Sequence, residues 1–446
     1  MRIVITGAGD VGTHLAEMLS IENHDIIVVD ANSDLIQRIS STLDIMTILG
    51  SPTSISILEE ADVEKADLFI AVSPEEETNI ISAILGKKLG AKRTIARIDD
   101  QDYLLPAHQE FFRSLGIDSL IYPEKIAAVE IISLLKQTGT SEFFDFSDGK
   151  LSLYVIKLDE NAPVVNQTML QTTKDKEALN YRAVAITRNG NTIIPRGEDV
   201  FKAGDTVYVI SNKHGVKDIL TYSGKESFEI NNLMILGGSR IGLRTAMELE
   251  NNINIKLIEI DREKSLKLAD LLENTLVIHG DGRNMDLLLN EGLKNMDAFI
   301  AVTGNSEANI ISCNLARQYG VKKTIAEIEN LDYINLAEKM GIDAVINKKL
   351  ITASYIFRFT MSAEVSSIKC LTGTDAEVLE FVVKPGAKAT KGIIKDIGFP
   401  KDSIIGGIIR GEKSIIARSD TQIQPNDRVV VFALPDAIAR LDDYFN

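Results

Sequence analysis

The sequence predicts an α/β protein with two Rossmann-like, doubly wound parallel-sheet domains, each followed by a small β-rich α+β domain. Three observations support this fold class. A glycine motif follows a short apolar run at two places, β-branched runs alternate with segments of helical apolar spacing, and a strand-and-turn pattern recurs after each such region. Alternating strands and helices favour a parallel sheet, and repeated landmarks indicate a duplicated unit. We therefore interpret the chain as a large module and a small module, followed by a second copy of each.

The large module repeats at a nearly constant spacing. Residues 77–82 (Glu-Thr-Asn-Ile-Ile-Ser) match residues 307–312 (Glu-Ala-Asn-Ile-Ile-Ser) at an offset of 230 residues. Nearer the glycine motifs the register slips by one residue, and Asp30 is matched with Asp261. A loop accommodates such an insertion at little cost. The two large modules are therefore predicted to share one fold.

The small module repeats at a different offset. Three polar landmarks recur 222 residues downstream, where Arg188, Arg196 and Asp205 match Arg410, Arg418 and Asp427. The two offsets together predict four domains, which we place at residues 1–137, 138–225, 226–362 and 363–446.

In each large module, short apolar runs alternate with amphipathic segments. The β-branched runs of the first module predict strands buried on both faces of a sheet, at residues 3–6, 26–29, 68–72 and 94–98. Helical spacing predicts helices that include residues 15–20, 78–89 and 125–136. Pro123 stands where a helix-initiating proline belongs. This order predicts right-handed crossovers between parallel strands.

The small modules have a different pattern. Their apolar runs predict strands at residues 151–158, 183–187, 192–195 and 206–211, separated by turns such as residues 188–191 and 203–205. We expect compact β-rich domains with one or two helices, and their residues form no recognisable catalytic arrangement.

The composition limits the classes of partner. The net charge is −16 and the pI is about 4.9, so the chain has no general attraction for nucleic acid or anionic lipid. No apolar run approaches the ~18 residues of a membrane-spanning helix, and the start does not resemble a signal peptide. Cys313 and Cys370 form no metal-ligand spacing and suggest a reducing compartment. We expect a cytoplasmic protein without direct membrane insertion.

A dinucleotide-binding motif opens the first large module. It follows a predicted strand and begins a predicted helix, and consists of Gly7, Ala8, Gly9, Asp10, Val11 and Gly12. The glycines suit a tight turn, close approach to a pyrophosphate and close helix–strand packing, and the helix N-terminus attracts phosphate. Asp30 ends the next strand, where a carboxylate accepts hydrogen bonds from ribose hydroxyls. This acid favours NAD over NADP.

The second large module carries a variant of the motif. Its residues are Gly237, Gly238, Ser239, Arg240, Ile241 and Gly242, with Asp261 as the matched acid. Ser239 replaces the glycine that lets the backbone approach a pyrophosphate. The second module is therefore either a nucleotide site or a retained fold with a decayed site.

Two matched positions exchange their charge between the halves. Asp10 corresponds to Arg240, and Arg97 corresponds to Glu327. Both positions lie near the carboxyl ends of the strands, where Rossmann domains bind ligands. One interpretation is a salt bridge of opposite polarity in each half. The other is a different preference for ligand charge, with Arg97 near the ligand in one half and Arg240 beside phosphates in the other.

Several of these residues together resemble one domain family. The glycine motif, the strand end at residues 71–73 and the turn at residues 116–118, with Asp30, Asn79 and Arg97, are similar to the nucleotide-binding domain of RCK (regulator of K+ conductance, or KTN) proteins. Arg188 and residues 202–207 are similar to the RCK C-terminal domain. The tandem order over the whole chain resembles the TrkA family, the regulatory subunits of Trk potassium uptake systems.

The resemblance implies a non-enzymatic subunit that binds NAD(H) and ATP/ADP and gates a potassium-translocating membrane subunit of the TrkH or TrkG type. It also implies a homo-oligomeric ring, dimeric or tetrameric, at the inner face of the cell membrane. By position, the two sites would use the glycine motifs with Asp30, Ser73, Pro74, Arg97 and Ile98 in the first, and Asp261, Thr303 and Glu327 in the second. Gly50-Ser51 departs from the Gly-Asp pair common in the family, which the second half keeps as Gly280-Asp281.

Two alternatives remain open at this point. An NAD-dependent oxidoreductase would need an acid or base beside the reacting atom, and none of the five histidines lies in a recognisable catalytic motif. A regulator of another cation channel or antiporter could be built from the same domains. Neither a catalytic nor a metal site is predicted.

Overall fold

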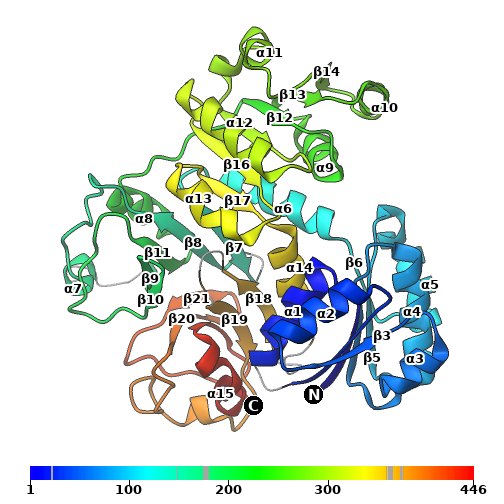
Figure 1. Cartoon of the computed structure of the whole chain (residues 1–446). Coiled ribbons are helices and arrows are strands. Elements are labelled where there is room, and N and C mark those ends of the chain that lie inside the picture. The colour runs from blue at the N-terminus through cyan, green and yellow to red at the C-terminus, as the bar shows by residue number, and fades with distance from the viewer. Residues whose placement is uncertain are drawn as a thin grey trace. The chain divides into compact units, whose positions relative to one another are not determined.

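The computed structural model describes residues 1–21, 24–147, 149–173, 180–357, 359, 365–371, 374 and 376–446, and Figure 1 shows its elements. The chain forms two compact units. The first holds residues 1–126 of the first large module together with the helix at residues 348–357. The second holds the remaining residues of that module from Ala127 on, the second large module and both small modules. The side chain of Cys370, one of the two cysteines that suggest a reducing compartment, lies outside the described part of the structure.

The first large module is a six-stranded parallel sheet covered by helices. Its strands, in the order β3-β2-β1-β4-β5-β6, are β1 (Arg2–Thr6), β2 (Asp25–Asp30), β3 (Met46–Leu49), β4 (Leu68–Ala71), β5 (Arg93–Arg97) and β6 (Ser119–Ile121). Its helices are α1 (Asp10–Ile21), α2 (Ser33–Thr42), α3 (Ile55–Glu60), η1 (Val63–Lys65), α4 (Glu76–Leu89), η2 (Gln101–Leu104), α5 (Pro106–Leu115) and α6 (Pro123–Lys136). The strand order reverses between β1 and β4, which confirms the predicted doubly wound fold.

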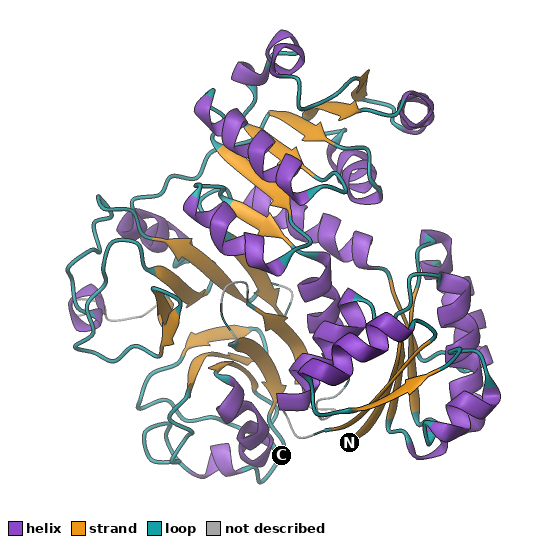
Figure 2. Cartoon of the chain, in the orientation of Figure 1, coloured by secondary structure: helices purple, strands orange, loops and turns teal. Residues whose placement is uncertain are grey.

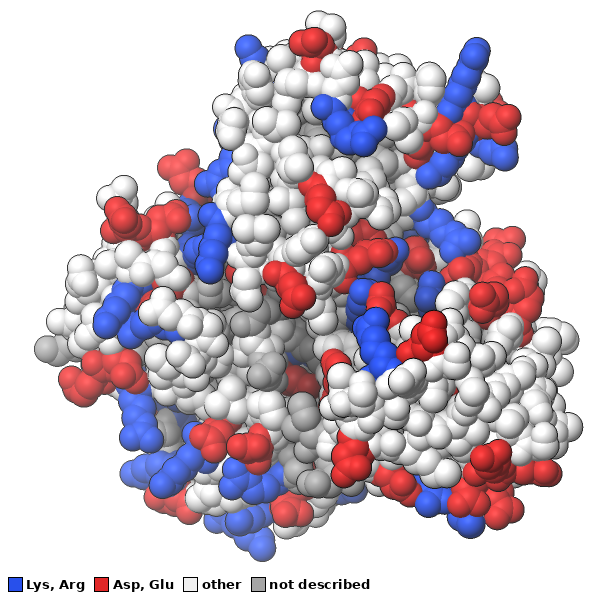
Figure 3. Space-filling view, viewed as in Figure 1, with Lys and Arg blue, Asp and Glu red and all other residues white. Residues whose placement is uncertain are grey.

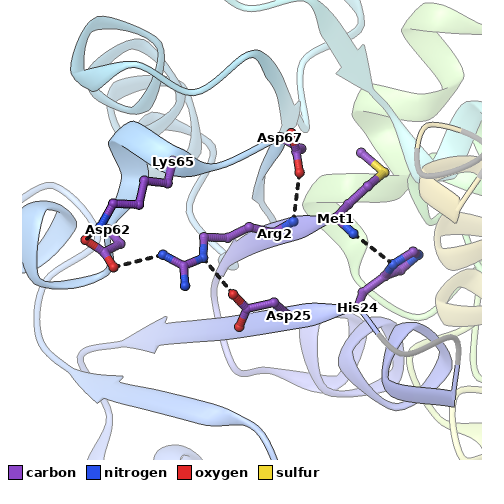
Figure 4. Close-up of polar contacts among 7 residues, drawn as sticks. All are labelled: Met1, Arg2, His24, Asp25, Asp62, Lys65 and Asp67. Carbon is purple, nitrogen blue, oxygen red and sulfur yellow. Dashed lines mark hydrogen bonds and ion pairs between the residues drawn. The ribbon is translucent and has the colours of Figure 1, made fainter.

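Arg2 ties together the amino end of this sheet, as Figure 4 shows. Its Nε lies 2.7 Å from Asp25 Oδ2 and its Nη1 lies 2.8 Å from Asp62 Oδ2. Its backbone N–H donates to Asp67 at 2.9 Å. Lys65 completes the network through Asp62 at 2.9 Å. The network joins β1 to the first residue of β2 and to the segment that precedes β4, at the end of the sheet opposite the glycine motif.

One helix of the first unit comes from a distant part of the sequence. The helix α14 (Lys348–Phe357) follows the second large module in the chain but packs against α1. Its buried face includes Ile351, Ala353 and Ile356, and α1 buries Leu15 and Leu19. Mutual burial of two apolar faces stabilises this arrangement. The placement differs from the predicted domain 226–362, which kept this helix with the second module.

The second large module has the same topology. Its parallel strands, in the order β14-β13-β12-β15-β16-β17, are β12 (Asn232–Leu236), β13 (Asn254–Glu259), β14 (Thr275–His279), β15 (Ala298–Ala301), β16 (Lys323–Glu327) and β17 (Ala344–Ile346). The helices are α9 (Arg240–Leu249), α10 (Arg262–Leu271), α11 (Met285–Asn290), η3 (Leu293–Asn295), α12 (Ser306–Gln318), η4 (Leu331–Tyr333) and α13 (Ile334–Lys339). Cys313 lies fully buried in α12, and burial raises the pKa of its thiol, as expected of a small core residue.

The small modules are five-stranded, mainly antiparallel sheets (Figure 2). The first, in the order β10-β9-β11-β8-β7, contains β7 (Glu142–Phe146), β8 (Leu151–Lys157), β9 (Tyr181–Arg188), β10 (Asn191–Ile193) and β11 (Thr206–Ser211), with α7 (Met169–Thr173) and α8 (Val216–Ser223). The second, in the order β18-β19-β22-β20-β21, contains β18 (Val365–Cys370), β19 (Glu377–Val382), β20 (Ser403–Arg410), β21 (Lys413–Ile416) and β22 (Arg428–Ala433), with η5 (Lys388–Lys391) and α15 (Pro435–Phe445).

The two small modules share one hydrophobic core. Val155 and Ile210 of the first module belong to the same buried cluster as Val378 and Val430 of the second. The rings of Tyr208 and Phe432 approach to 5.8 Å between centroids across this core. Such continuity indicates that the two small modules form one folded body.

The landmarks that revealed the small repeat have a structural role. Arg188 Nε lies 2.7 Å from Oδ1 of the buried Asp205, and Arg410 repeats this pair with Asp427 at 2.8 Å. Each arginine also donates to a backbone carbonyl, Val200 in the first module and Gln422 in the second. The pair fixes the turn before β11 and its counterpart before β22. It therefore marks the fold rather than a ligand site.

Surface charge and helix hydrophobicity are the two properties relevant to contact with a membrane. Figure 3 shows acidic and basic side chains interspersed on the visible face. Within the ranges described above, no helix combines the length and the apolar character that a membrane span requires.

Candidate functional site

The glycine loop of the first module lies at the point where the strand order reverses. Gly7 follows β1 with a φ of 106°, a conformation that favours glycine. A Cβ on Gly7 would lie 2.7 Å from the backbone nitrogen of Ser73, which follows β4. The loops after the two central strands therefore touch at the carboxyl edge of the sheet. Ligands of open α/β sheets bind at this edge.

The other two motif glycines have contrasting surroundings. A Cβ on Gly12 would lie 1.8 Å from the carbonyl oxygen of Gly7, so only glycine lets α1 approach the loop. A Cβ on Gly9 would meet no heavy atom within 4 Å. The space beside Gly9 is open, which is the arrangement that lets a pyrophosphate approach the backbone.

Asp30 holds the glycine loop from the neighbouring strand. Its Oδ2 accepts a hydrogen bond from the Ala8 N–H at 2.6 Å, and its Oδ1 accepts one from the Asn32 N–H at 2.8 Å. The residue remains partly exposed. A carboxylate offers about four acceptor positions, so these two bonds leave acceptor capacity for hydroxyl groups of a ligand.

Asn79 joins the ends of β4 and β5. This fully buried side chain accepts a hydrogen bond from the Ser73 N–H at 2.7 Å and donates to the carbonyls of Ser73 at 2.8 Å and Arg97 at 3.0 Å. It positions two loops that border the cleft. Sequence reasoning did not place Asn79 among the site residues, although its recurrence as Asn309 was the signal.

The charged residues of the first cleft do not pair with each other. Asp10 Oδ2 lies 2.6 Å from Lys349 Nζ of α14, and Asp10 Oδ1 lies 3.9 Å from Arg38. Arg97 Nη2 lies 3.3 Å from Asp99 Oδ1, and its Nε has no hydrogen-bond partner among the described residues. Of the two interpretations of the charge exchange, the one that pairs Asp10 with Arg97 in a salt bridge is therefore wrong for the first half.

The remaining predicted residues of the first site differ in exposure. Val11 is partly exposed beside Asp10, and Pro74 is exposed after Ser73. The side chain of Ile98 is fully buried and its N–H donates to the Ile121 carbonyl at 2.8 Å. Ile98 therefore faces the core, and its side chain supports the cleft from beneath.

The glycine loop of the second module keeps the backbone of the first. Gly237 has a φ of 103°, and a Cβ on Gly242 would lie 2.2 Å from the Gly237 carbonyl oxygen. Ser239 caps α9, because its Oγ accepts a hydrogen bond from the Gly242 N–H at 3.3 Å. The serine thus uses one of the N–H groups that a helix N-terminus presents to an anion. Arg240 and the buried Ile241 follow in the first turn of α9, with Arg240 exposed.

In the second module the residue at the position of Asp30 is Glu259 rather than Asp261. Glu259 ends β13, and its Oε2 accepts a hydrogen bond from the Gly238 N–H at 2.9 Å, as Asp30 does from Ala8. Asp261 is the N-cap of α10 and accepts a hydrogen bond from the Lys264 N–H at 2.8 Å. The match of Asp30 with Asp261 was therefore wrong. It was based on the shared residue type, whereas the residue that ends the strand, as Asp30 does, is Glu259.

Glu259 is more enclosed than Asp30. It is 5% exposed, and its Oε1 accepts a hydrogen bond from the Asp261 N–H at 2.9 Å. Its Oε2 also lies 3.0 Å from Lys264 Nζ. Burial opposes the charge of Glu259, but hydrogen bonds from these groups lower the pKa of its carboxyl below the usual value. The charge of this acid is compensated within the protein.

Two other predicted residues of the second site border the same edge. Thr303 follows β15, and its N–H and Oγ1 donate to Asn309 Oδ1 at 3.1 Å and 2.6 Å. Glu327 ends β16 with a buried side chain, and its backbone carbonyl accepts a hydrogen bond from Asn309 at 2.8 Å. The loops after β15 and β16 are thus held as those after β4 and β5 are.

Comparison with known proteins explains this repeated geometry. Residues 3–123 and 233–348 match the TrkA-N domain, and residues 153–224 and 378–446 match the TrkA-C domain. The chain belongs to the TrkA family. A relative from Archaeoglobus fulgidus, named Trk system potassium uptake protein TrkA homolog, is 33% identical over the full length of both chains. Another, Trk system potassium uptake protein TrkA from Vibrio alginolyticus, is 32% identical over 97% of this chain and 95% of its own.

Solved structures share the fold at low sequence identity. A structure titled GsuK channel bound to NAD has a TM-score of 0.61 at 17% identity, and covers 100% of this chain and 78% of that one. The GsuK RCK domain has a TM-score of 0.59 at 17% identity, covering 100% of this chain and 94% of that one. The predicted order of a large and a small module, each present twice in this TrkA-family chain, is therefore an RCK fold.

Proposed function

We propose that this chain is a nucleotide-responsive regulatory subunit of a Trk-type potassium uptake system. The single observation that carries the proposal is the arrangement at the carboxyl edge of the first sheet, where the open glycine loop follows β1, Asp30 ends β2 and Arg97 ends β5. Membership of the TrkA family supplies the potassium uptake context. The relatives bear names of a potassium uptake protein rather than of an oxidoreductase, which supports a non-enzymatic role.

The first cleft would hold NAD(H). The open space beside Gly9 would admit the pyrophosphate to the N-terminus of α1, and Asp30 would accept hydrogen bonds from ribose hydroxyls. Arg97, whose Nε has no hydrogen-bond partner within the described chain, would contact a phosphate.

The second cleft would favour ATP or ADP. Lys264 and two backbone N–H groups already engage Glu259, which leaves this acid a poorer acceptor for ribose than Asp30. Arg240 is exposed in the first turn of α9, where a cation attracts a terminal phosphate. The different charge balance supports a ligand with more phosphate charge than in the first cleft.

The partner would be a potassium-translocating membrane subunit of the TrkH or TrkG type. The chain would assemble with copies of itself, as a dimer or tetramer, into a ring at the cytoplasmic face of that subunit. The acidic composition supports attachment through protein rather than through anionic lipid. A nucleotide could shift the ring only as far as its affinity differs between two conformations.

Three measurements test this function. Full-length protein should co-purify with its membrane potassium subunit, and NADH or ATP should change potassium flux in vesicles that contain both. NADH mixed with the chain and a panel of small carbonyl compounds should keep a constant absorbance at the nicotinamide band. Steady enzyme-dependent oxidation would instead support the oxidoreductase alternative, and potassium flux that ignores both nucleotides would contradict the regulatory role.

A further inference from the structure

The first small module contains a cavity that the nucleotide clefts do not involve. It has a volume of about 420 Å³ and is lined mainly by apolar side chains of β8, β9, β11 and α8, such as Ile156, Val209 and Ile219. Residues 417–419 of the second small module form part of its wall. Ligand pockets in proteins are of this size, and combine an apolar lining with a few polar groups.

The second small module fills the corresponding space with aromatic rings. Ile156 pairs with Val207 in the first module, as Phe381 pairs with Val429 in the second. Ser223 ends α8, and Phe445 ends α15. Phe381 and Phe445 stack at 4.6 Å between ring centroids and are both buried, whereas Ile156 and Ser223 line the cavity.

This difference indicates that the cavity is not required by the fold. The same small-module architecture closes around two rings in one copy and around open space in the other. Apolar side chains that face unfilled space lose packing contacts, which lowers the stability of the fold. Because the second copy fills the corresponding space with side chains, the open cavity of the first copy is expected to bind a ligand.

The charges of the cavity define the chemistry of that ligand. Arg182 Nη1 donates to the backbone carbonyls of Ile405 at 3.0 Å and Ala417 at 2.7 Å, and burial lowers the pKa of its guanidinium. Among the described residues, no carboxylate forms an ion pair with Arg182, and those that line the cavity include Arg196 and Arg418 but no acid. A partly buried cation without a counter-charge is costly, and an anion would compensate it.

We propose that the first small module binds an amphipathic anion, with its apolar body in the cavity and its carboxylate at Arg182. Because the second small module supplies part of the wall, the bound molecule stabilises the contact between the two small modules. The inference goes beyond the nucleotide-dependent function and does not depend on it.

The test uses full-length protein and octanoate as the probe. Titration calorimetry should detect octanoate binding, and 1-octanol, which has the same chain without the charge, should bind at least tenfold more weakly. Ser223→Phe introduces the side chain that the second module already carries, and should weaken octanoate binding more than tenfold. Arg182→Met should weaken octanoate to the affinity of octanol and leave octanol unchanged. Arg440→Met, which removes an exposed arginine from α15, is the matched control and should have no effect.

Three results would overturn the proposal. Unmodified protein that does not bind octanoate would exclude the site. Ser223→Phe that keeps the thermal unfolding temperature and the octanoate affinity of the unmodified chain would place the binding elsewhere. Arg182→Met that binds octanoate as tightly as before would remove the anion from the assignment. If Ser223→Phe fails to fold, the comparison of octanoate with octanol in Arg182→Met still decides the question.

Discussion

The first glycine loop rests on a partly exposed acid, Asp30, whereas the second rests on the buried Glu259 with Lys264 at its carboxylate. The backbone of the two loops is nearly the same, since Gly7 and Gly237 have φ angles of 106° and 103°. The two loops differ in how many hydrogen-bond acceptor positions of the carboxylate remain available to a ligand. A duplicated fold therefore conserves the positions that packing requires and allows the positions that face the cleft to diverge.

The largest expected effect separates packing from binding within one loop. Gly12→Ala would place a Cβ 1.8 Å from the Gly7 carbonyl and should destabilise the first unit by about 3 kcal/mol or more. Gly9→Ser, which copies Ser239, should leave the thermal unfolding temperature nearly unchanged but weaken NADH binding, because its side chain enters open space. Thermal unfolding and NADH titration measure both effects. Equal destabilisation by the two substitutions would show that the loops differ in packing as well.

A second prediction concerns the amino ends of β5 and β16. Lys323, which begins β16, is 1% exposed and donates to the carbonyl of Thr140 at 2.5 Å, whereas its counterpart Arg93 is partly exposed. Burial lowers the pKa of Lys323 to about 8. Between pH 8 and about 10.4 the unfolded chain binds more protons at this residue than the folded chain, so the free energy of unfolding should rise with pH by up to about 3 kcal/mol.

The measurement is the difference in unfolding free energy between unmodified protein and Lys323→Met across this pH range. Subtraction cancels the titration of tyrosines, including Tyr154, whose pKa burial raises to about 12. Arg93→Met is the control, and should show no such slope. A flat difference curve for Lys323→Met would mean that this lysine keeps its ordinary pKa in the folded protein.

The third prediction tests the corrected acid assignment. Asp30→Ala should weaken NADH binding by about 1.5–3 kcal/mol, because it removes a charged hydrogen-bond acceptor. Asp261→Ala should cost about 1 kcal/mol of stability through loss of the α10 cap, with nucleotide affinities unchanged. Titration calorimetry with NADH and ATP distinguishes the two acids. A loss of ATP affinity in Asp261→Ala would return Asp261 to the second site.

The smallest effect is expected at the amino end of β1. The Arg2 side chain forms ion pairs with Asp25 and Asp62, whereas the side chain of its counterpart Asn232 is uncharged and accepts a hydrogen bond from Asn254 at 3.3 Å. Exposed ion pairs contribute about 0.2–1 kcal/mol each and weaken with salt. Arg2→Asn should therefore lower the unfolding free energy by less than about 2 kcal/mol at low salt. The loss should shrink at high salt, and a salt-independent loss would point to packing by the arginine stem.

Features that depend on neighbouring residues in the sequence could be predicted, whereas features that depend on tertiary contacts could not. The glycine loops, the central strands and Asp30 could be placed because turn, burial and strand end leave marks in adjacent residues. The short strands β3 and β6 were not predicted, since few residues carry their pattern, and the five-residue strand β7 was also missed. Glu259 was missed because only its pairing with the Gly238 N–H shows that it, and not Asp261, occupies the strand end. The packing of α14 against α1 was not predicted, because it depends on contacts between residues far apart in the sequence.

The shared core of the small modules has a consequence for how the chain behaves on dilution. Two copies of such a module on separate chains would associate in a bimolecular step, so their pairing would depend on protein concentration. Here both copies belong to one chain, which keeps each at a high effective concentration near the other. The two small modules should therefore stay paired at any dilution. Because the two copies are encoded separately, a substitution in one copy leaves the other unchanged. The aromatic filling of one copy and the cavity of the other are the kind of asymmetry that this arrangement permits.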